Sequence, residues 1–134
     1  MATYTKFQQF VEDLAHGVHD LETDAITVAL SNTAPSASAD AVLGDITTVS
    51  TANLDDITLT VSSSSQTSGT YKLVLADKTM TASGAVGPFQ YVIIYNDSAA
   101  NKELICFFDY GSEVTLAKDD TFKLDFGTEL FSLA

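Results

Sequence analysis

The chain has 134 residues, 46% of them hydrophobic, and 18 acidic residues against 6 lysines give a net charge of −12. This length fits one domain, 1–134, and the apolar content can fill a core without disulfide or metal staples. Nucleic-acid binding is excluded because it requires clustered cations. The chain also lacks arginine, whose planar guanidinium group binds phosphates through paired hydrogen bonds. We therefore expect no nucleic-acid partner and no phosphate-dependent chemistry.

No membrane partner is expected either. The longest charge-free stretch, residues 79–96, contains Thr, Ser, Gly, Pro, Gln and Asn, whereas a spanning helix needs a nearly continuous apolar run. The N-terminal MATYTKFQQFVEDL carries acids and lacks the basic start and apolar stretch of a secretory signal. The single cysteine, Cys106, lies among apolar residues, which predicts a buried thiol and a reducing compartment.

One α-helix is predicted near the N-terminus, over about residues 5–17. Its apolar residues recur at i, i+3, i+4 and i+7, as on one helix face: Phe7, Phe10, Val11 and Leu14. Thr5 and Gln8 have the spacing of a capping box, and Gly17 can adopt the left-handed conformation that ends a helix. The helix is therefore expected to run from Thr5 to about His16 and to pack its apolar face on the strands that follow.

The middle of the chain predicts short strands separated by polar turns. Ala25–Leu30 alternates apolar and polar residues, whereas residues 36–50 are interpreted as a loop that can hold a short helical turn. Ile57–Val61 is the next strand. The serine-rich residues 62–68 then form a polar hairpin tip, from which the chain returns along Thr70–Ala76.

A central hairpin is predicted from two strongly apolar segments. They follow a polar strand, Lys78–Ala82, which SGAVGP at residues 83–88 interrupts with glycines and a proline. The segments are Phe89–Tyr95 (FQYVIIY) and Glu103–Tyr110 (ELICFFDY). Because both contain consecutive apolar residues, we expect them to be buried on both faces.

The C-terminal part predicts a turn and two further strands. Asp109–Ser112 is interpreted as the turn, Val114–Leu116 as a short strand and Thr121–Phe126 as a strand whose three apolar side chains share one face. Seven or eight short strands at this spacing are typical of sandwiches. The predicted fold class is mainly β: an antiparallel β-sandwich, jelly-roll-like, over about residues 25–134, with one N-terminal α-helix.

The histidines and acid pairs offer little chemistry. His16 and His19 have helical metal-ligand spacing, but Gly17 between them is expected to end the helix, so we favour a solvated helix end. The acid pairs Asp55–Asp56 and Asp119–Asp120 lack a calcium-loop spacing and are interpreted as solvated or turn-capping. A cation held by them between subunits stays open.

No enzyme motif is present. The chain has no G-x-S-x-G elbow, P-loop, G-x-G-x-x-G or cysteine pair. We expect no catalytic, cofactor-binding or metal-binding residues, no cofactor and no small-molecule substrate. A cluster of aromatic residues in and beside the central hairpin is interpreted as core, with a subunit contact through its tyrosines as the alternative: Phe89, Tyr91, Tyr95, Phe107, Phe108 and Tyr110.

Three segments in this order resemble a family of small tailed-bacteriophage virion proteins. They are KFQQFVEDLAHGVHDLETDAITVALSNTAPSAS, TMTASGAVGPFQYVIIYND and FFDYGSEVTLAKDDTFKLDFG. The resemblance covers residues 6–127, and is least clear over residues 49–78. None of the segments is a catalytic signature.

The resemblance implies a structural role in the virion. The expected role is a capsid decoration, or cement, protein that binds the outer surface of the head as a homotrimer and bridges neighbouring major capsid protein subunits. It implies assembly in the host bacterial cytoplasm. A tail or head-fibre component that binds a receptor or carbohydrate is the alternative, and a small hydrolase has only scattered carboxylates to support it.

Overall fold

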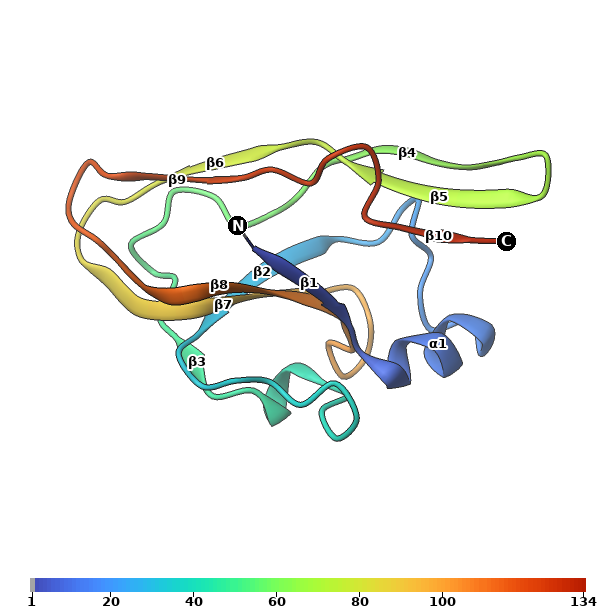
Figure 1. Cartoon of the computed structure of the whole chain (residues 1–134), viewed down its shortest axis with the longest axis horizontal. Coiled ribbons are helices and arrows are strands. Elements are labelled where there is room, and N and C mark those ends of the chain that lie inside the picture. The colour runs from blue at the N-terminus through green and yellow to red at the C-terminus, as the bar shows by residue number, and fades with distance from the viewer. Residues whose placement is uncertain (1) are drawn as a thin grey trace.

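The computed structural model describes residues 2–134 and is mainly β (Figure 1). Every pairing between its ten strands is antiparallel, and the sheets form a sandwich-like arrangement with one α-helix, α1 (Gln8–Ala15). The strands are β1 (Thr3–Lys6), β2 (Ile26–Ser31), β3 (Thr48–Val49), β4 (Val61–Thr67), β5 (Thr70–Leu75), β6 (Lys78–Thr81), β7 (Val86–Asn96), β8 (Leu104–Leu116), β9 (Thr121–Leu124) and β10 (Phe131–Leu133). The predicted fold class is confirmed, but its jelly-roll connectivity is not.

One layer is a five-stranded sheet with the order β1-β8-β7-β2-β3. Its centre is the predicted hairpin of β7 and β8, in which Ile93 lies opposite Phe107 and Ile94 opposite Cys106. Residues 92–95 of β7 and 104–107 of β8 are buried on both faces, as their consecutive apolar spacing predicted, whereas Tyr91, Phe108 and Tyr110 of the predicted segments are only half-buried. All six residues of β2 are buried as well.

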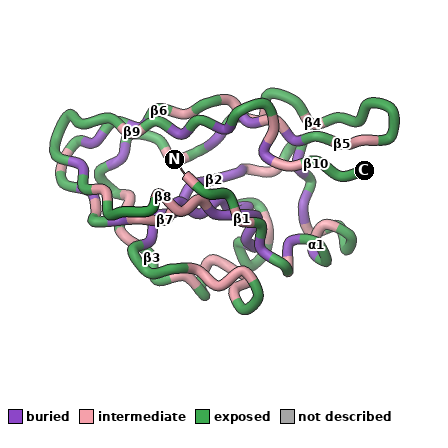
Figure 2. The backbone as a smooth tube through the Cα atoms, in the orientation of Figure 1, coloured by how far each residue is buried: buried purple, intermediate pink, exposed green. Residues whose placement is uncertain are grey.

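The opposite layer consists of a three-stranded sheet, β10-β5-β4, and a two-stranded sheet, β6-β9. In Figure 1 both lie above the large sheet, and Figure 2 shows buried residues along the facing strands. One cluster of buried apolar side chains fills the space between the layers. Its largest fully buried members are Phe7, Phe10, Phe89, Ile26, Leu30, Leu73, Leu75, Met80, Ile93, Ile94, Leu104 and Ile105.

The helix is confirmed, with corrections at its start and on its face. Thr5 belongs to β1, where it pairs with Phe107, and the residue that caps α1 is Phe7, without a side-chain hydrogen bond. The capping-box prediction is therefore wrong, because an extended Thr5 cannot reach back to the helix. Val11 is 54% exposed, so the buried face is narrower than predicted and rests mainly on Phe10.

The end of the helix follows the prediction. Gly17 has φ +75°, its N–H donates to the Leu14 carbonyl at 3.3 Å, and the Val18 N–H donates to the Asp13 carbonyl at 2.9 Å. These two bonds are the pattern of a Schellman motif, which satisfies carbonyls that the helix leaves free.

The serine-rich tip is not a loop. β4 continues through it to Thr67, and only Ser68 (φ 52°) and Gly69 (φ 84°) form the turn, with Thr67 paired to Thr70. Positive φ at both central residues is the two-residue type I′ hairpin turn. A strand that is exposed to solvent along its edge and on its faces needs no alternation of apolar and polar residues. The sequence of residues 62–67 therefore carried no pattern from which a strand could be predicted.

The predicted turn at Asp109–Ser112 is also wrong. β8 passes through it as a bulge: Asp109 lies opposite Tyr91, and Val114 lies opposite Phe89, so four residues of β8 face one residue of β7. Gly111 absorbs the distortion with φ +76°. Turn-forming residues and bulge-forming residues overlap, because both need the left-handed conformation.

Three further features complete the fold. β1 and β10 were not predicted, and they pair with β8 and β5 at the two ends of the chain. Residues 43–45 form a short 3-10 turn in the segment where a helical turn was expected. None of the helices within residues 2–134 has the length and apolar character needed to span a membrane.

Candidate functional site: an aromatic groove beside β8

A groove with a mainly apolar lining runs between β8 and the segment that begins with β9. We call it the aromatic groove; its volume is about 450 Å³, and its lining residues are Ala2, Phe108, Tyr110, Lys123, Leu124, Asp125, Phe126 and Gly127. Phe108 and Tyr110 are two residues apart on β8, so they project from the same face of the strand. The groove therefore presents aromatic rings on one wall and the end of β9 on the other.

The groove is open because β8 is longer than its neighbour. β1 pairs with β8 only from Cys106 to Asp109, and its first residue, Thr3, lies opposite Asp109. Beyond that point β8 pairs with β7 alone within the described residues. The side chain of Tyr110 thus lies where no strand covers the edge, and it is half-buried.

Ring contacts hold the walls in place. The Tyr110 and Phe122 ring centroids are 5.2 Å apart, and those of Phe108 and Phe126 are 6.1 Å apart. Such tilted pairs at 4.5 to 7 Å are favourable beyond their buried area. Burial raises the pKa of Tyr110, so its hydroxyl stays protonated near neutral pH and can both donate and accept a hydrogen bond.

The rim of the groove is charged. Lys123 and Asp125 flank Leu124 on β9 and just beyond it. The Lys123 ammonium lies 3.9 Å from the Asp77 carboxylate, and its side chain is 62% exposed. A long, exposed pair of this kind contributes little to stability, so the Lys123 ammonium can contact a partner at little cost, whereas Asp125 accepts the Gly127 N–H at 2.9 Å.

The aromatic cluster expected from sequence divides into two sets. Phe89, Tyr95 and Phe107 are buried, as the interpretation of the cluster as core required. Tyr91, Phe108 and Tyr110 are half-buried, and only the latter two line the groove. Phe126, on the opposite wall, was predicted as a buried position of the last strand; its place in the groove had no sequence signal, because it depends on how two distant segments meet.

The two histidines have different environments. His16 is exposed, as a solvated helix end requires, but His19 is only 7% exposed and its ring lies 5.1 Å from that of Phe10. The expectation of solvent exposure is therefore wrong for His19. The reversal of the chain at Gly17 brings it back against the helix, a tertiary effect that spacing does not show.

His19 belongs to a buried polar cluster. The Asn96 side-chain amide donates to His19 Nδ1 at 2.9 Å and to an Asp24 carboxylate oxygen at 2.6 Å. Burial lowers the pKa of His19, and the nearby carboxylates of Asp13, Glu103 and Asp24 oppose that shift. Since Nδ1 accepts a hydrogen bond, the proton of the neutral ring is on Nε2.

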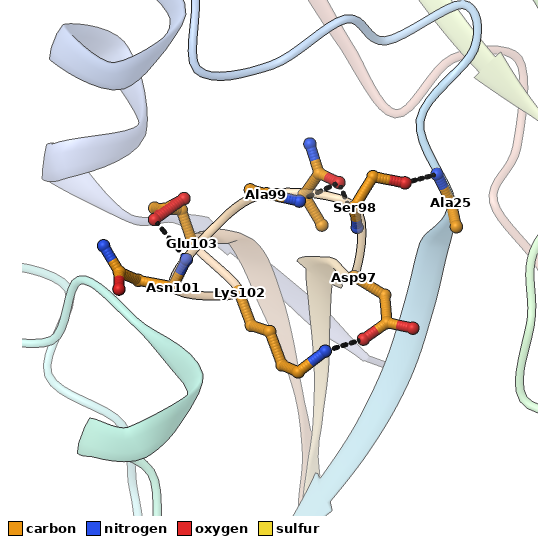
Figure 3. Close-up of polar contacts among 8 residues, drawn as sticks. Ala25, Asp97, Ser98, Ala99, Asn101, Lys102 and Glu103 are labelled. Atoms are coloured by element: carbon orange, nitrogen blue, oxygen red, sulfur yellow. Dashed lines mark hydrogen bonds and ion pairs between the residues drawn. The ribbon is translucent and has the colours of Figure 1, made fainter.

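The same cluster organises the turn between β7 and β8. Asn96 Oδ1 accepts hydrogen bonds from the backbone N–H groups of Ser98 and Ala99, and Glu103 accepts one from Asn101. Figure 3 shows these bonds, the ion pair of Lys102 with Asp97, and the bond from Ala25 N–H to the Ser98 hydroxyl. The cluster is thus a structural joint between this turn and the segment before β2.

Two of the paired acids cap turns, as one of the two interpretations predicted: Asp56 accepts the Thr58 N–H at 2.9 Å, and Asp120 does the same for a nearby N–H. Asp55 instead accepts the N–H of the distant Thr81 at 2.9 Å, and this bond lowers the Asp55 pKa. Asp56 also lies 2.7 Å from the Lys78 ammonium, which lowers the Asp56 pKa. Asp120 accepts the Ala117 N–H at 2.8 Å. Among residues 2–134 no group of three or more His, Cys, Asp and Glu could hold a metal ion.

Cys106 is fully buried in β8, as predicted. Burial is the main reason why its pKa is raised, so the thiolate, the reactive form, is suppressed. The thiol is therefore part of the core and not of the groove.

No protein-family model matches the chain, and no curated protein or solved structure matches it either.

Proposed function

We propose that this protein is a non-enzymatic structural protein of a tailed-bacteriophage virion. In this role it is a capsid decoration protein, a homotrimer on the outer surface of the head, where it bridges neighbouring major capsid protein subunits and stabilises the shell. It is assembled there in the host bacterial cytoplasm. The proposal rests on the sequence resemblance together with the aromatic groove.

The groove is the observation that carries the proposal. Half-buried aromatic side chains with a charged rim are the composition of protein-binding surfaces, in which aromatic residues supply most of the binding energy. Phe108 and Tyr110 have this character, Phe126 is a buried ring on the opposite wall, and Lys123 and Asp125 lie at the rim. The net charge of −12 supports a place on the outside of the head and away from its DNA.

The test is co-sedimentation of the purified protein with undecorated phage heads, combined with its mass in solution by light scattering. We expect a trimer that pellets with the heads. Tyr110→Ala removes one of the two aromatic rings on the β8 wall of the groove and should weaken binding by about tenfold or more. Tyr110→Phe keeps the ring and should bind within about threefold of the unmodified chain, since only the hydroxyl is lost and one hydrogen bond is worth little in net free energy.

Two outcomes would count against the proposal. One is an unmodified protein that stays in the supernatant at every ratio of protein to heads. The other is a Tyr110→Ala variant that is folded by circular dichroism and binds heads as well as Tyr110→Phe does.

A second candidate function is a receptor- or carbohydrate-binding module of a tail or head fibre. The Tyr110 ring beside the charged Lys123 and Asp125 favours it, because an apolar ring with a few convergent polar groups is typical of small-ligand sites. A glycan screen that finds no ligand, together with retention on heads, would remove this candidate.

A further inference from the structure

β4 is an exposed edge strand without a charged residue. It forms the end of the β10-β5-β4 sheet, so β5 is its neighbour on one side and no other strand within residues 2–134 pairs with it on the other. Five of its seven residues are exposed and two are half-buried. The hairpin of β4 and β5 extends beyond the rest of the molecule in Figure 1. Unpaired edges of this kind are templates for strand pairing.

The charge pattern points to the occupant of this edge. Each copy of the chain carries −12, so two copies repel each other wherever carboxylates meet. Residues 57–76, which include the whole hairpin, contain no Asp or Glu, and their one charged residue is Lys72. The absence of carboxylates at this edge lowers the repulsion most when the partner is equally acidic. A second copy of this chain is such a partner.

The backbone geometry is self-complementary. Thr67 and Thr70 close the two-residue hairpin and exchange hydrogen bonds, and hydrogen-bonded pairs alternate along an antiparallel ladder. Ser65 therefore bonds to β5, while the N–H and C=O groups of Ser64 and Gln66 point to the free side. A register shift between Val61 and Ser63 ends the regular segment, which leaves residues 63–67 as the flat part of the edge.

We propose that two copies of the chain pair antiparallel through β4, around a two-fold axis at Ser65. In this register Ser64 of each copy exchanges two hydrogen bonds with Gln66 of the other, and Ser63 faces Thr67 of the other copy. Four hydrogen bonds form, and no carboxylate enters the contact.

This contact differs from the proposed trimer. A three-fold axis joins unlike surfaces and cannot bring β4 to β4, whereas a two-fold axis joins like surfaces. The β4 contact therefore links one assembly unit, whether a single copy or a ring, to a neighbouring unit. A short polar ladder gives weak pairing, which becomes significant where copies are held close together, as on a shell.

The experiment measures solution mass by light scattering as the concentration rises. The double variant Ser63→Asp/Thr67→Asp places carboxylates opposite one another across the axis, which destabilises cross-strand pairs. Ser63→Asn/Thr67→Asn is the matched neutral control. We expect the unmodified chain and the Asn variant to rise first to twice the mass of the basic unit, and the Asp variant to keep the mass of the basic unit.

A mixture gives a second readout that only this register explains. Ser63→Lys/Thr67→Lys alone should also fail to pair, but mixed with the Asp variant it should restore the doubled mass, since opposite charges then face each other. The inference is overturned if the unmodified chain does not double by about 1 mM, the limit of weak association, or if the folded Asp variant doubles as the Asn variant does. Failure to bind phage heads would overturn the proposed function and leave this result unaffected.

Discussion

At the scale of single residues, the buried polar cluster makes His19 sensitive to acid. His19 is almost fully enclosed, and its Nδ1 accepts a hydrogen bond from Asn96. Its Nε2 has no hydrogen-bond partner among the described residues, and the same is true of one carboxylate oxygen each of Asp13 and Glu103. The carboxylates lessen the cost of a charged ring but do not cancel it, since burial is the largest influence on its pKa.

We therefore predict that stability falls as the pH drops below about 6.5, the ordinary histidine value. The folded state has the lower pKa, so the unfolded chain takes up the proton first, and the contribution of neutral His19 is complete only above that pH. Thermal melts between pH 7.5 and 5.5 measure the loss. His19→Gln should flatten this dependence, whereas His16→Gln, at an exposed position, should leave it unchanged. Equal slopes in all three proteins would refute the assignment.

At the scale of elements, periodicity predicted what is apolar and buried. The helix, the hairpin of β7 and β8 and the alternating strand β9 were found because burial imposes a repeat on their sequences. β4 and β1 were missed because exposed edge strands lack that repeat. The bulge at Gly111 has the same composition as a turn, so only its pairing with β7 distinguishes the two.

The aromatic groove could be predicted only in part, because the sequence pattern identifies apolar positions but not which distant segments meet. The sequence identified Phe108, Tyr110 and Phe126 as aromatic positions near a core. That Phe126 faces the two others depends on where β9 returns and where β1 ends. Neither position is encoded in a local repeat.

Gly17 provides the prediction at this scale. A β-carbon at Gly17 would meet no atom within 4 Å, so Gly17→Ala tests backbone conformation alone. With φ +75°, the substitution should lower the free energy of unfolding by about 1 kcal/mol, because alanine disfavours the left-handed region. Gly44→Ala is the control, since it is equally uncrowded and lacks a positive φ. Urea unfolding measures the stability of both variants, and equal unfolding midpoints would contradict the role of the Schellman motif.

At the scale of the whole molecule, the apolar core and the net charge have opposite effects on the stability of the fold. The buried apolar side chains form one continuous cluster, but 18 carboxylates on one small domain repel one another in the folded state more than in the expanded chain. The four ion pairs found in the described residues offset little of this, because at least one partner in each is substantially exposed.

We predict that salt stabilises the protein. Raising ionic strength from about 0.01 to 0.5 M shortens the screening length from about 30 Å to under 8 Å, so repulsion across the domain fades while the core is unaffected. The melting temperature should rise with sodium chloride and level off.

A variant with one carboxylate fewer should have a melting temperature that depends less on salt. Asp40→Asn is such a variant, but Asp40 also accepts the Ser36 N–H. Glu22→Gln therefore serves as the cleaner variant, since the Glu22 side chain is exposed and makes no hydrogen bond or ion pair within residues 2–134. A melting temperature that is flat or falls with salt would mean that local ion pairs outweigh the net charge. The same screening should strengthen pairing through β4, so one titration tests the charge balance within a copy and between copies.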